Sequence, residues 1–517
     1  GHRVHGPGPF VVPDAREYFC VLSDQGRVML EGVRRREHIM DEGNRLAASK
    51  NGKILWNESL LDEVQGLCEL PVPILGGFAP SFLEVPREVL LTSMETHQKS
   101  FGLEGKDGAL LPYFLTVLNL EAQEPALVKK GWERVLHARL EDARFFWQSD
   151  LAAGFEAWLN ALDSVTFLAS LGSMGDKSRR LANLCGWLSE NVRLMQDQPL
   201  PEKEEVMRAG RLCKADLVSE MVKEFDTLQG VMGGIYALRM GESENVAWAI
   251  RDQYPPAGPE SALPDALPGA FLSLADKADT LAGCFGLAMI PTGTADPYGL
   301  RRAALGIIRI IREKEIRLDI FAFLAQALEE YGPREWKLPP EQALLRLRDF
   351  FTLRLKNQFI AEGAETLLAE ACLLADASDV WSVSARLAAL TAFSRAEDFP
   401  QAVLTFKRAA NIISKQGQDG EEPLSGTYRA DLFADEAEKA LAAELERLFP
   451  LFADLWQADR YAELFSLLRD LRPFIDAFFD QVMVMCEDES IRRNRLNLLK
   501  ALIARLGRLA DFTALQI

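Results

Sequence analysis

Residues 131–147 read GWERVLHARLEDARFFW, and the apolar spacing of this stretch differs from that of the residues before it. Its apolar side chains recur every three to four positions, which is typical of one buried face of a helix. They are Val135, Leu136, Leu140, Ala143 and Phe146. Nearly all of the chain after this stretch keeps a similar spacing, so we predict that it is helical.

The residues before this stretch have a different pattern, which predicts mixed α/β structure for 1 to about 150. Short apolar runs bounded by Gly, Pro, Asn and Asp favour strands. These runs are PFVV (9–12), YFCVL (18–22), LPVPIL (70–75) and YFLTVLNL (113–120). Helices are expected around 33–44 and 87–99. Pro71 and Pro73 favour a sheet edge or a connector for the third run, because proline cannot donate to a central ladder.

The length and the breaks in the pattern indicate several domains. At roughly 150 residues per domain, 517 residues suggest about three. The segment YPPAGPESALPDALPG (254–269) reads as a loop, and the region around 337–340 as a joint. We therefore predict a predominantly α, multidomain chain with an α/β domain at 1–152 and helical domains at 153–335 and 336–517.

Composition limits the classes of function. The formal net charge of −18 disfavours a non-specific nucleic-acid binder, so RNA contacts must come from local basic patches. No apolar run reaches the roughly 18 residues of a membrane span. The seven cysteines form no CxxC pair, which favours buried thiols in a reducing cytoplasm over a zinc ribbon or disulfides. The chain begins GHRVHGP, without Met or a secretory signal, and we expect a fragment.

The motifs for nucleotide chemistry and hydrolysis are missing from the sequence. There is no GxxxxGK[ST] loop, no strand-anchored GxGxxG and no GxSxG elbow, so ATP chemistry has no visible site here. All five histidines lie at or before His137. The helical regions therefore cannot supply an imidazole ligand or base, and we expect no catalytic residue, no metal and no cofactor in this chain.

Three segments combine basic side chains with helical spacing. In DPYGLRRAALGIIRIIREK (296–314), Arg302 and Arg309 share the face opposite an apolar stripe, and Arg301 lies beside them. The other two are FKRAANIIS (406–414) and IRRNRLNLL (491–499). Their candidate RNA contacts are Lys407, Arg408, Asn411, Arg492, Arg493, Asn494 and Arg495. Arginine can bind phosphate oxygens with two N–H groups, and asparagine can bond base edges. For the first and third segments, an ordinary solvated helix face remains an alternative.

A fourth group pairs aspartate with lysine. LADKADTLAGCFG (274–286) contains Asp276, Lys277 and Asp279, and CKADLVSEMVKEF (213–225) contains Lys214 and Asp216. On adjacent helices these residues would form either a degraded metal site or a buried ion-pair network. The missing histidines favour the network.

Taken in order, the motifs point to one family. They are GHRVHGP, LPVPILGGF, VPREVLLTSMETHQKSF, ARLEDARFFWQSD, SLGSMGDKSRRL, CKADLVSEMVKEFDTLQGVMG, LADKADTLAGCFG, IPTGTADPYGLRRAALGIIRI, FKRAANI and FFDQVMVMCEDESIRRNRLNLL. This succession resembles the beta subunit of heterotetrameric bacterial glycyl-tRNA synthetase, from the first residue nearly to the last.

The resemblance implies an α2β2 assembly in the cytoplasm, in which the alpha subunit uses ATP and Mg²⁺ to activate glycine. The beta subunit would bind and position tRNA-Gly, with neither DNA nor a membrane as a partner. It implies a domain similar to the B3/B4 domain of phenylalanyl-tRNA synthetase, then a helical HD-like domain and a helical anticodon-binding domain. Family chains carry a further N-terminal portion.

The HD-like signature needs a His-Asp pair to hold metal, whereas the matching stretch here reads Lys214-Ala215-Asp216. That difference favours a scaffold or an RNA surface over a phosphohydrolase. Two other functions stay open: an HD-type metal-dependent phosphohydrolase, and an assembly subunit without RNA contact, which the −18 charge supports.

Overall fold

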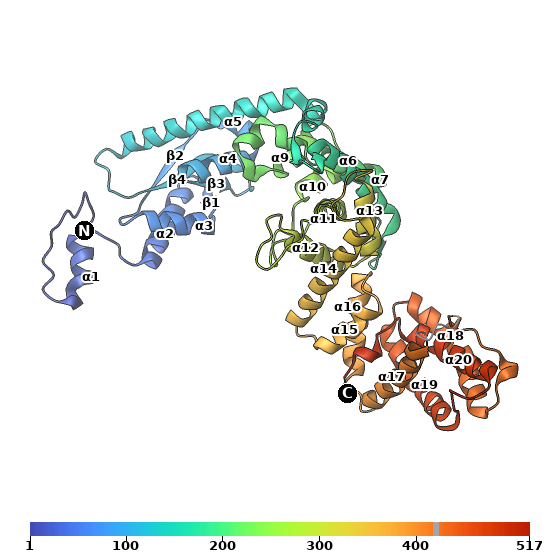
Figure 1. Cartoon of the computed structure of the whole chain (residues 1–517). Helices are drawn as coiled ribbons and strands as arrows, with labels where there is room; N and C mark the ends of the chain where they lie inside the picture. The colour runs from blue at the N-terminus through green and yellow to red at the C-terminus, as the bar shows by residue number, and fades with distance from the viewer. Residues whose placement is uncertain (417–422, 517) are drawn as a thin grey trace. The chain divides into compact units, whose positions relative to one another are not determined.

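The computed structural model describes residues 1–416 and 423–516 (Figure 1). The chain divides into two compact units. The first unit comprises Gly1–Val165 and Leu212–Ala247, and the second comprises Thr166–Arg211 and Trp248–Ile517. Residues 212–247 thus group with the α/β part, although the sequence placed them in the expected domain 153–335. The expected domain boundaries stay predictions.

The first unit is built around a four-stranded antiparallel sheet with the order β1-β3-β4-β2. Its strands are β1 (Gly52–Ile54), β2 (Val72–Gly77), β3 (Phe101–Gly105) and β4 (Leu110–Leu118). Strand β2 is an edge strand and contains Pro73, as predicted. Strand β4 covers most of the predicted run 113–120.

Helices cover both faces of this sheet (Figure 1). On one face, α2 (Gly32–Ala48) and α3 (Glu58–Leu67) enclose a core with β1, β3 and β4. On the other face lie α4 (Arg87–Thr92) and the long α5 (Pro125–Leu162). Helix α5 bends at Gly154, whose φ of 71° is a conformation that glycine adopts without strain. The helices predicted at 33–44 and 87–99 are confirmed in outline, the second ending in a π-helical turn.

Two predicted strands are wrong. Residues 9–12 have no regular structure, and Val11 is 84% exposed. Residues 18–22 are helical, with α1 (Tyr18–Cys20) running into a π-helical turn at Val21–Gln25. Apolar runs become strands only where a neighbouring strand and a core accept them, and neither run has such neighbours. The short β1 and the glycine-containing β3 were missed, because GKI and FGLEG do not alternate clearly.

The second unit is helical and centres on α11 (Leu267–Gly286), which is buried over almost its whole length. Four helices pack directly against it. They are α6 (Met174–Asn191), α12 (Leu300–Glu313), α13 (Ile320–Glu329) and α14 (Pro340–Ala361). The predicted apolar stripe of α12 is confirmed for Leu300, Ala304, Ile307 and Ile311, which are buried, whereas its fifth member Ala303 is half-buried.

The remaining helices confirm the prediction of a mostly α-helical chain. The C-terminal ones are α15 (Thr366–Ala375), α16 (Val380–Phe393), α17 (Phe399–Gln416), α18 (Glu436–Gln457), α19 (Tyr461–Gln481) and α20 (Glu489–Leu506). The shorter ones are α7 (Lys203–Leu212), α8 (Glu220–Glu224), α9 (Val231–Arg239) and α10 (Glu244–Arg251). Helices α18 and α19 pack as a pair, and α17 packs against α19 and α20.

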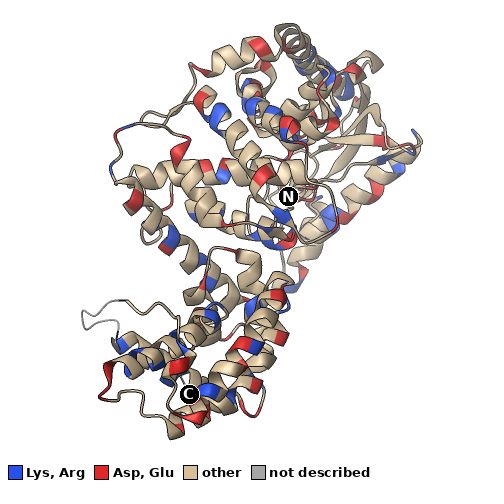
Figure 2. Cartoon of the chain, turned by 90° about the vertical axis from the view of Figure 1, so that its right-hand side faces the viewer, with Lys and Arg blue, Asp and Glu red and all other residues tan. Residues whose placement is uncertain are grey.

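Within the described ranges, no helix is both long enough and apolar enough to cross a lipid bilayer. Lys and Arg are interspersed with Asp and Glu along the helices (Figure 2). Attraction for an anionic partner must therefore come from local groups of cations.

Candidate nucleic-acid interface

Helix α17 presents polar side chains on one outward face. Arg408, Asn411 and Lys415 are exposed and follow one another at intervals of three and four residues, which puts them on the same side of a helix. The Arg408 guanidinium lies 4.4 Å from the centre of the Phe479 ring. Of the residues predicted on this helix, Arg408 and Asn411 are thus available to a ligand. Lys407 instead donates to the carbonyl of Leu515 at 2.7 Å and holds the C-terminal segment.

Helix α20 does not present the exposed cluster that the sequence suggested. Arg495 is 5% exposed, pairs with Asp435 at 2.8 Å and with Glu438, and donates to the Met483 carbonyl at 2.9 Å. Asn494 is also buried. Its amide accepts from the Arg429 N–H at 2.7 Å and donates to the Arg429 carbonyl at 3.0 Å. The prediction that Asn494 and Arg495 lie in an exposed patch is therefore wrong, because distant chain segments fold over them.

The other two residues of that segment are half-buried. Arg492 donates to the Cys486 carbonyl at 3.3 Å, and Arg493 lies beside it in the sequence. This contact and that of Arg495 with Met483 hold the loop between α19 and α20. The loop exposes Met483 and Met485, which are 75% and 49% exposed.

On α12, one of the three predicted arginines is exposed and the other two are half-buried. The exposed residue is Arg302. Arg301 donates to the Gly293 carbonyl at 2.7 Å. Arg309, predicted on the outward face, reaches the carbonyls of Gly258 at 2.8 Å and Ser261 at 3.2 Å. Two of these guanidinium groups thus fasten the adjoining loops to the helix.

The aspartate-lysine group on α11 belongs to a buried ion-pair cluster. Asp279 is fully buried between Lys177 at 2.8 Å and Arg180 at 2.5 Å, both from α6. Burial by itself would raise the pKa of Asp279, but the two cations hold it below its usual value. Tyr331 donates to the Asp279 carbonyl at 2.9 Å, and the Arg180 guanidinium lies 3.8 Å from the centre of its ring. The sequence did not single out Lys177 and Arg180, although both lie in the quoted motif SLGSMGDKSRRL.

The other members of that group take different partners. Asp276 pairs with Lys177 at 3.1 Å. Lys277 donates to the Ser273 hydroxyl at 2.6 Å and to the Tyr254 carbonyl at 3.0 Å, so it holds the start of the loop at 254–269. Among the residues described, no group of three or more His, Cys, Asp and Glu side chains is placed to hold a metal ion.

Asp216 lies in the first unit and is fully buried, with Lys214 also buried two residues before it. The Asp216 carboxylate accepts from the backbone N–H groups of Gly230 at 2.6 Å and Gly233 at 3.1 Å. Burial raises its pKa to about 6, against the opposing effect of these two hydrogen bonds. Asp216 therefore fixes the start of α9, and its ionised form destabilises the folded state.

That pKa predicts a pH-dependent stability. An unfolded aspartate titrates near pH 3.9, so the folded state binds the Asp216 proton more tightly than the unfolded state does. The resulting stabilisation is complete below about pH 4 and is lost as pH rises to about 6, amounting to about 3 kcal/mol. We expect Asp216→Asn to remove this dependence in urea titrations between pH 4 and 7.

Asp176 provides the control. Its carboxylate caps α6, and the Ser173 N–H and Arg179 lower its pKa to about 2. The stabilisation from Asp176 is present above about pH 4 and is lost as pH falls towards 2, so Asp176→Asn should leave the interval between pH 4 and 7 unchanged. Identical pH profiles for Asp216→Asn and the parent chain would contradict the assignment.

Comparison with known proteins identifies the family. The family model described as "Glycyl-tRNA synthetase beta subunit" matches residues 1–374. A relative from Oleidesulfovibrio alaskensis, named "Glycine--tRNA ligase beta subunit", is 63% identical over all of this chain and 73% of its own length. The chain belongs to the glycyl-tRNA synthetase beta subunit family.

More distant members of the family agree. The glycine–tRNA ligase beta subunits of Magnetococcus marinus and Coxiella burnetii are 40% and 38% identical, each over all of this chain and 73% of its own length. A second family model, "DALR anticodon binding domain", matches residues 403–511. That range runs from α17 to just beyond α20, so the outward face of α17 belongs to the anticodon-binding domain of this beta-subunit chain.

Proposed function

We propose that this beta-subunit chain binds tRNA-Gly through α17–α20 and positions the tRNA 3′ end for a separate alpha subunit. The observation that carries the proposal is the match of residues 403–511 to an anticodon-binding domain. The alpha subunit would form glycyl-adenylate with ATP and Mg²⁺, so no cofactor is assigned to this chain. The working assembly would be a cytoplasmic α2β2 heterotetramer, and the ligands of this chain would include neither DNA nor a membrane.

The chemistry of the beta subunit is positional. Arg408 would engage a backbone phosphate and Asn411 a base edge of the unpaired anticodon loop, the part of an RNA that proteins read by sequence. Holding the acceptor end beside the adenylate would contribute through orientation, which can lower a barrier by about 7–11 kcal/mol. Long-range attraction contributes little, because the chain carries a net charge of −18.

Arg408→Gln combined with Lys415→Gln is expected to weaken binding of tRNA-Gly and to reduce its salt dependence. The logarithm of the affinity falls linearly with the logarithm of the salt concentration, and each lost phosphate contact should make this slope shallower by about one. Filter binding at several salt concentrations measures both quantities. Lys439→Gln on α18 is the matched control, because Lys439 is exposed but already paired with Glu436 at 2.8 Å. Equal affinities and slopes for the double variant and the control would remove α17 from the interface.

The overall proposal is tested by titrating the chain with tRNA-Gly and with a non-cognate tRNA at two salt concentrations. Tighter cognate binding that weakens at high salt is the expected outcome. Absent or equal binding of both tRNAs would favour an assembly subunit without RNA contact, for which the net charge of −18 is the supporting observation.

A further inference from the structure

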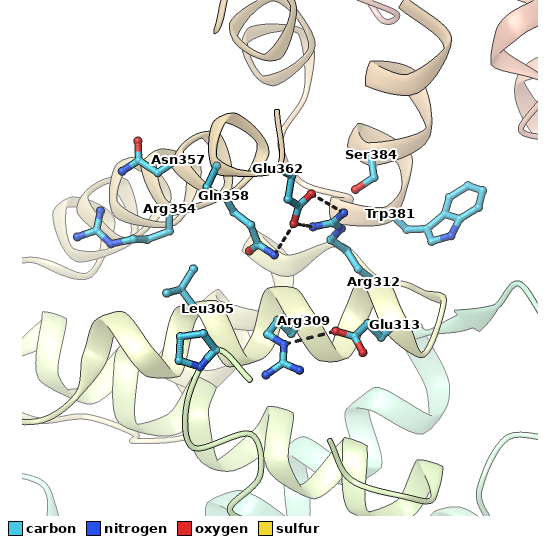
Figure 3. A pocket seen from close by; sticks show the side chains of 12 residues that line it. Leu305, Arg309, Arg312, Glu313, Arg354, Asn357, Gln358, Glu362, Trp381 and Ser384 are labelled. Carbon is cyan, nitrogen blue, oxygen red and sulfur yellow. Dashed lines mark hydrogen bonds and ion pairs between the residues drawn. The ribbon is translucent and has the colours of Figure 1, made fainter. Parts of the chain in front are cut away.

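A pocket of about 890 Å³ lies between α12, α14 and α16 in the second unit (Figure 3). Helix α12 contributes Arg309 and Arg312, and α14 contributes Arg354, Asn357 and Gln358. Figure 3 shows Arg354 and Asn357 at one end and Trp381 of α16 at the other. The volume is within the range of roughly 300–1,000 Å³ that is usual for small-molecule sites.

The arginines of this pocket differ in the groups that balance their positive charge. Arg312 forms a two-pronged pair with Glu362 at 2.7 and 2.9 Å, and this contact is the main cause of the lowered Glu362 pKa. Arg309 is held by the loop carbonyls at 258 and 261. The guanidinium groups of Arg309 and Arg312 are therefore fixed parts of the pocket wall. The lining as a whole carries one more cationic than anionic side chain, since Glu313 and Glu362 face three arginines.

Arg354 has no such partner. Its guanidinium lies 4.3 Å from the centre of the Phe350 ring, and it makes no hydrogen bond or ion pair with any residue in the ranges 1–416 and 423–516. Its pKa is lowered, first by burial and then by the nearby charge of Arg301, and the charge of Asp296 opposes this shift only in part. A partly buried cation beside a second cation favours an anion as its ligand, and the guanidinium N–H groups match phosphate oxygens.

Gln358 adds a second polar group without a full set of partners. Its Nε2 donates to Glu362 at 3.1 Å, whereas its Oε1 is buried and accepts no hydrogen bond from the described residues. A buried acceptor without a hydrogen bond is unfavourable. A ligand with an amino or hydroxyl donor would satisfy it.

We propose that this pocket binds a single nucleotide, with its phosphate on Arg354 and a base or ribose donor on the Oε1 of Gln358. The amides of Asn357 and Gln358 suit base edges. Trp381, at the far end of the pocket, already has the Arg317 guanidinium 5.3 Å from the centre of its ring. A bare phosphate would leave most of the volume empty. The nucleotide comes either from an unpaired segment of tRNA or from a free mononucleotide, and this inference does not depend on the assignment of α17.

The experiment compares Arg354→Gln with Arg348→Gln in the full chain. Arg348 lies on the same helix and its guanidinium is 4.9 Å from the centre of the Phe321 ring, so it is a matched cation outside this pocket. Calorimetry with AMP and filter binding with tRNA-Gly give two affinities for each variant, and thermal melts verify that both fold. We expect Arg354→Gln to lower the affinity for at least one of the two ligands about tenfold. Arg348→Gln should leave both affinities unchanged.

The two ligands separate the sources of the nucleotide. A loss of tRNA affinity without measurable AMP binding assigns the pocket to an unpaired tRNA nucleotide, whereas a loss of AMP affinity alone assigns it to a free nucleotide. Indistinguishable affinities for Arg354→Gln and Arg348→Gln, with both variants folded, overturn the site. If AMP binds, inorganic phosphate should bind more weakly than AMP, and Gln358→Met should weaken the binding of AMP. Equal affinities for phosphate and AMP, both unchanged by Gln358→Met, would overturn the nucleotide assignment. The α17 variant is measured separately, so failure of either proposal leaves the other intact.

Discussion

Replacing Asp279 with alanine is expected to lower the free energy of unfolding of the second unit by about 3–5 kcal/mol, the largest effect predicted for this chain. Asp279 is fully buried, and the side chains of Lys177 and Arg180 are only 4% and 5% exposed. Removing the carboxylate leaves two buried cations, of which Lys177 keeps Asp276 at 3.1 Å. Neither can reach bulk water without opening the packing of α6 against α11.

Urea denaturation followed by circular dichroism measures the loss, and hydrogen exchange locates it. The matched control is Glu190→Ala on the same helix α6, because Glu190 pairs with Lys203 at an exposed site. Exposed pairs contribute about 0–1 kcal/mol. A triple variant with Lys177→Met, Arg180→Met and Asp279→Leu should recover part of the stability, since apolar replacement of buried ions is often neutral. Asp276 keeps its charge in this variant, and its side chain is 17% exposed. An Asp279→Ala loss no larger than that of Glu190→Ala would contradict this account.

Arg495→Ala is expected to destabilise the α18–α20 region by about 3 kcal/mol. Its partner Glu438 has no exposed surface and would lose the guanidinium with which it is paired. The backbone N–H groups of Ala434 and Asp435 still donate to Glu438, which keeps the loss near the lower end of the range for broken buried pairs. Thermal unfolding of the chain measures the effect.

This prediction separates structural from RNA-binding arginines. Arg492→Ala removes a half-buried neighbour on the same helix and should cost less than about 1 kcal/mol. Any fall in tRNA affinity for Arg495→Ala should then follow the fraction of unfolded protein and disappear at lower temperature. A stable Arg495→Ala chain with weakened tRNA binding would instead return Arg495 to the interface.

Helical periodicity could be predicted well, because it depends on neighbours within one or two turns. The stripe of α12 and the helix at 33–44 are examples. The two prolines limited residues 70–75 to a sheet edge or a connector, and β2 is an edge strand. Predictions failed where the partner is distant in sequence. The runs at 9–12 and 18–22 have strand composition, but no strand or core lies beside them.

The candidate site shows the same division. Arg408 and Asn411 were found because exposure on α17 follows from its own periodicity. The burial of Arg495 depends on Asp435 and Glu438, which lie about 60 residues earlier, and nothing in IRRNRLNLL indicates it. Arg354 was missed because LRLKN resembles any solvated helix face, and its pocket exists only once α12, α14 and α16 pack together.

The sequence by itself determined the family, the mostly helical class and the order of the motifs, since these are properties of residue identity and short-range spacing. Tertiary structure alone decided which cations are available to a ligand. The choice depends on desolvation and on partners from other helices: Arg180 and Arg495 are enclosed with carboxylates, whereas Arg354 forms no ion pair with the residues that the structure describes. Charge on a side chain is local, but the dielectric and the counter-charges around it are set by the whole fold.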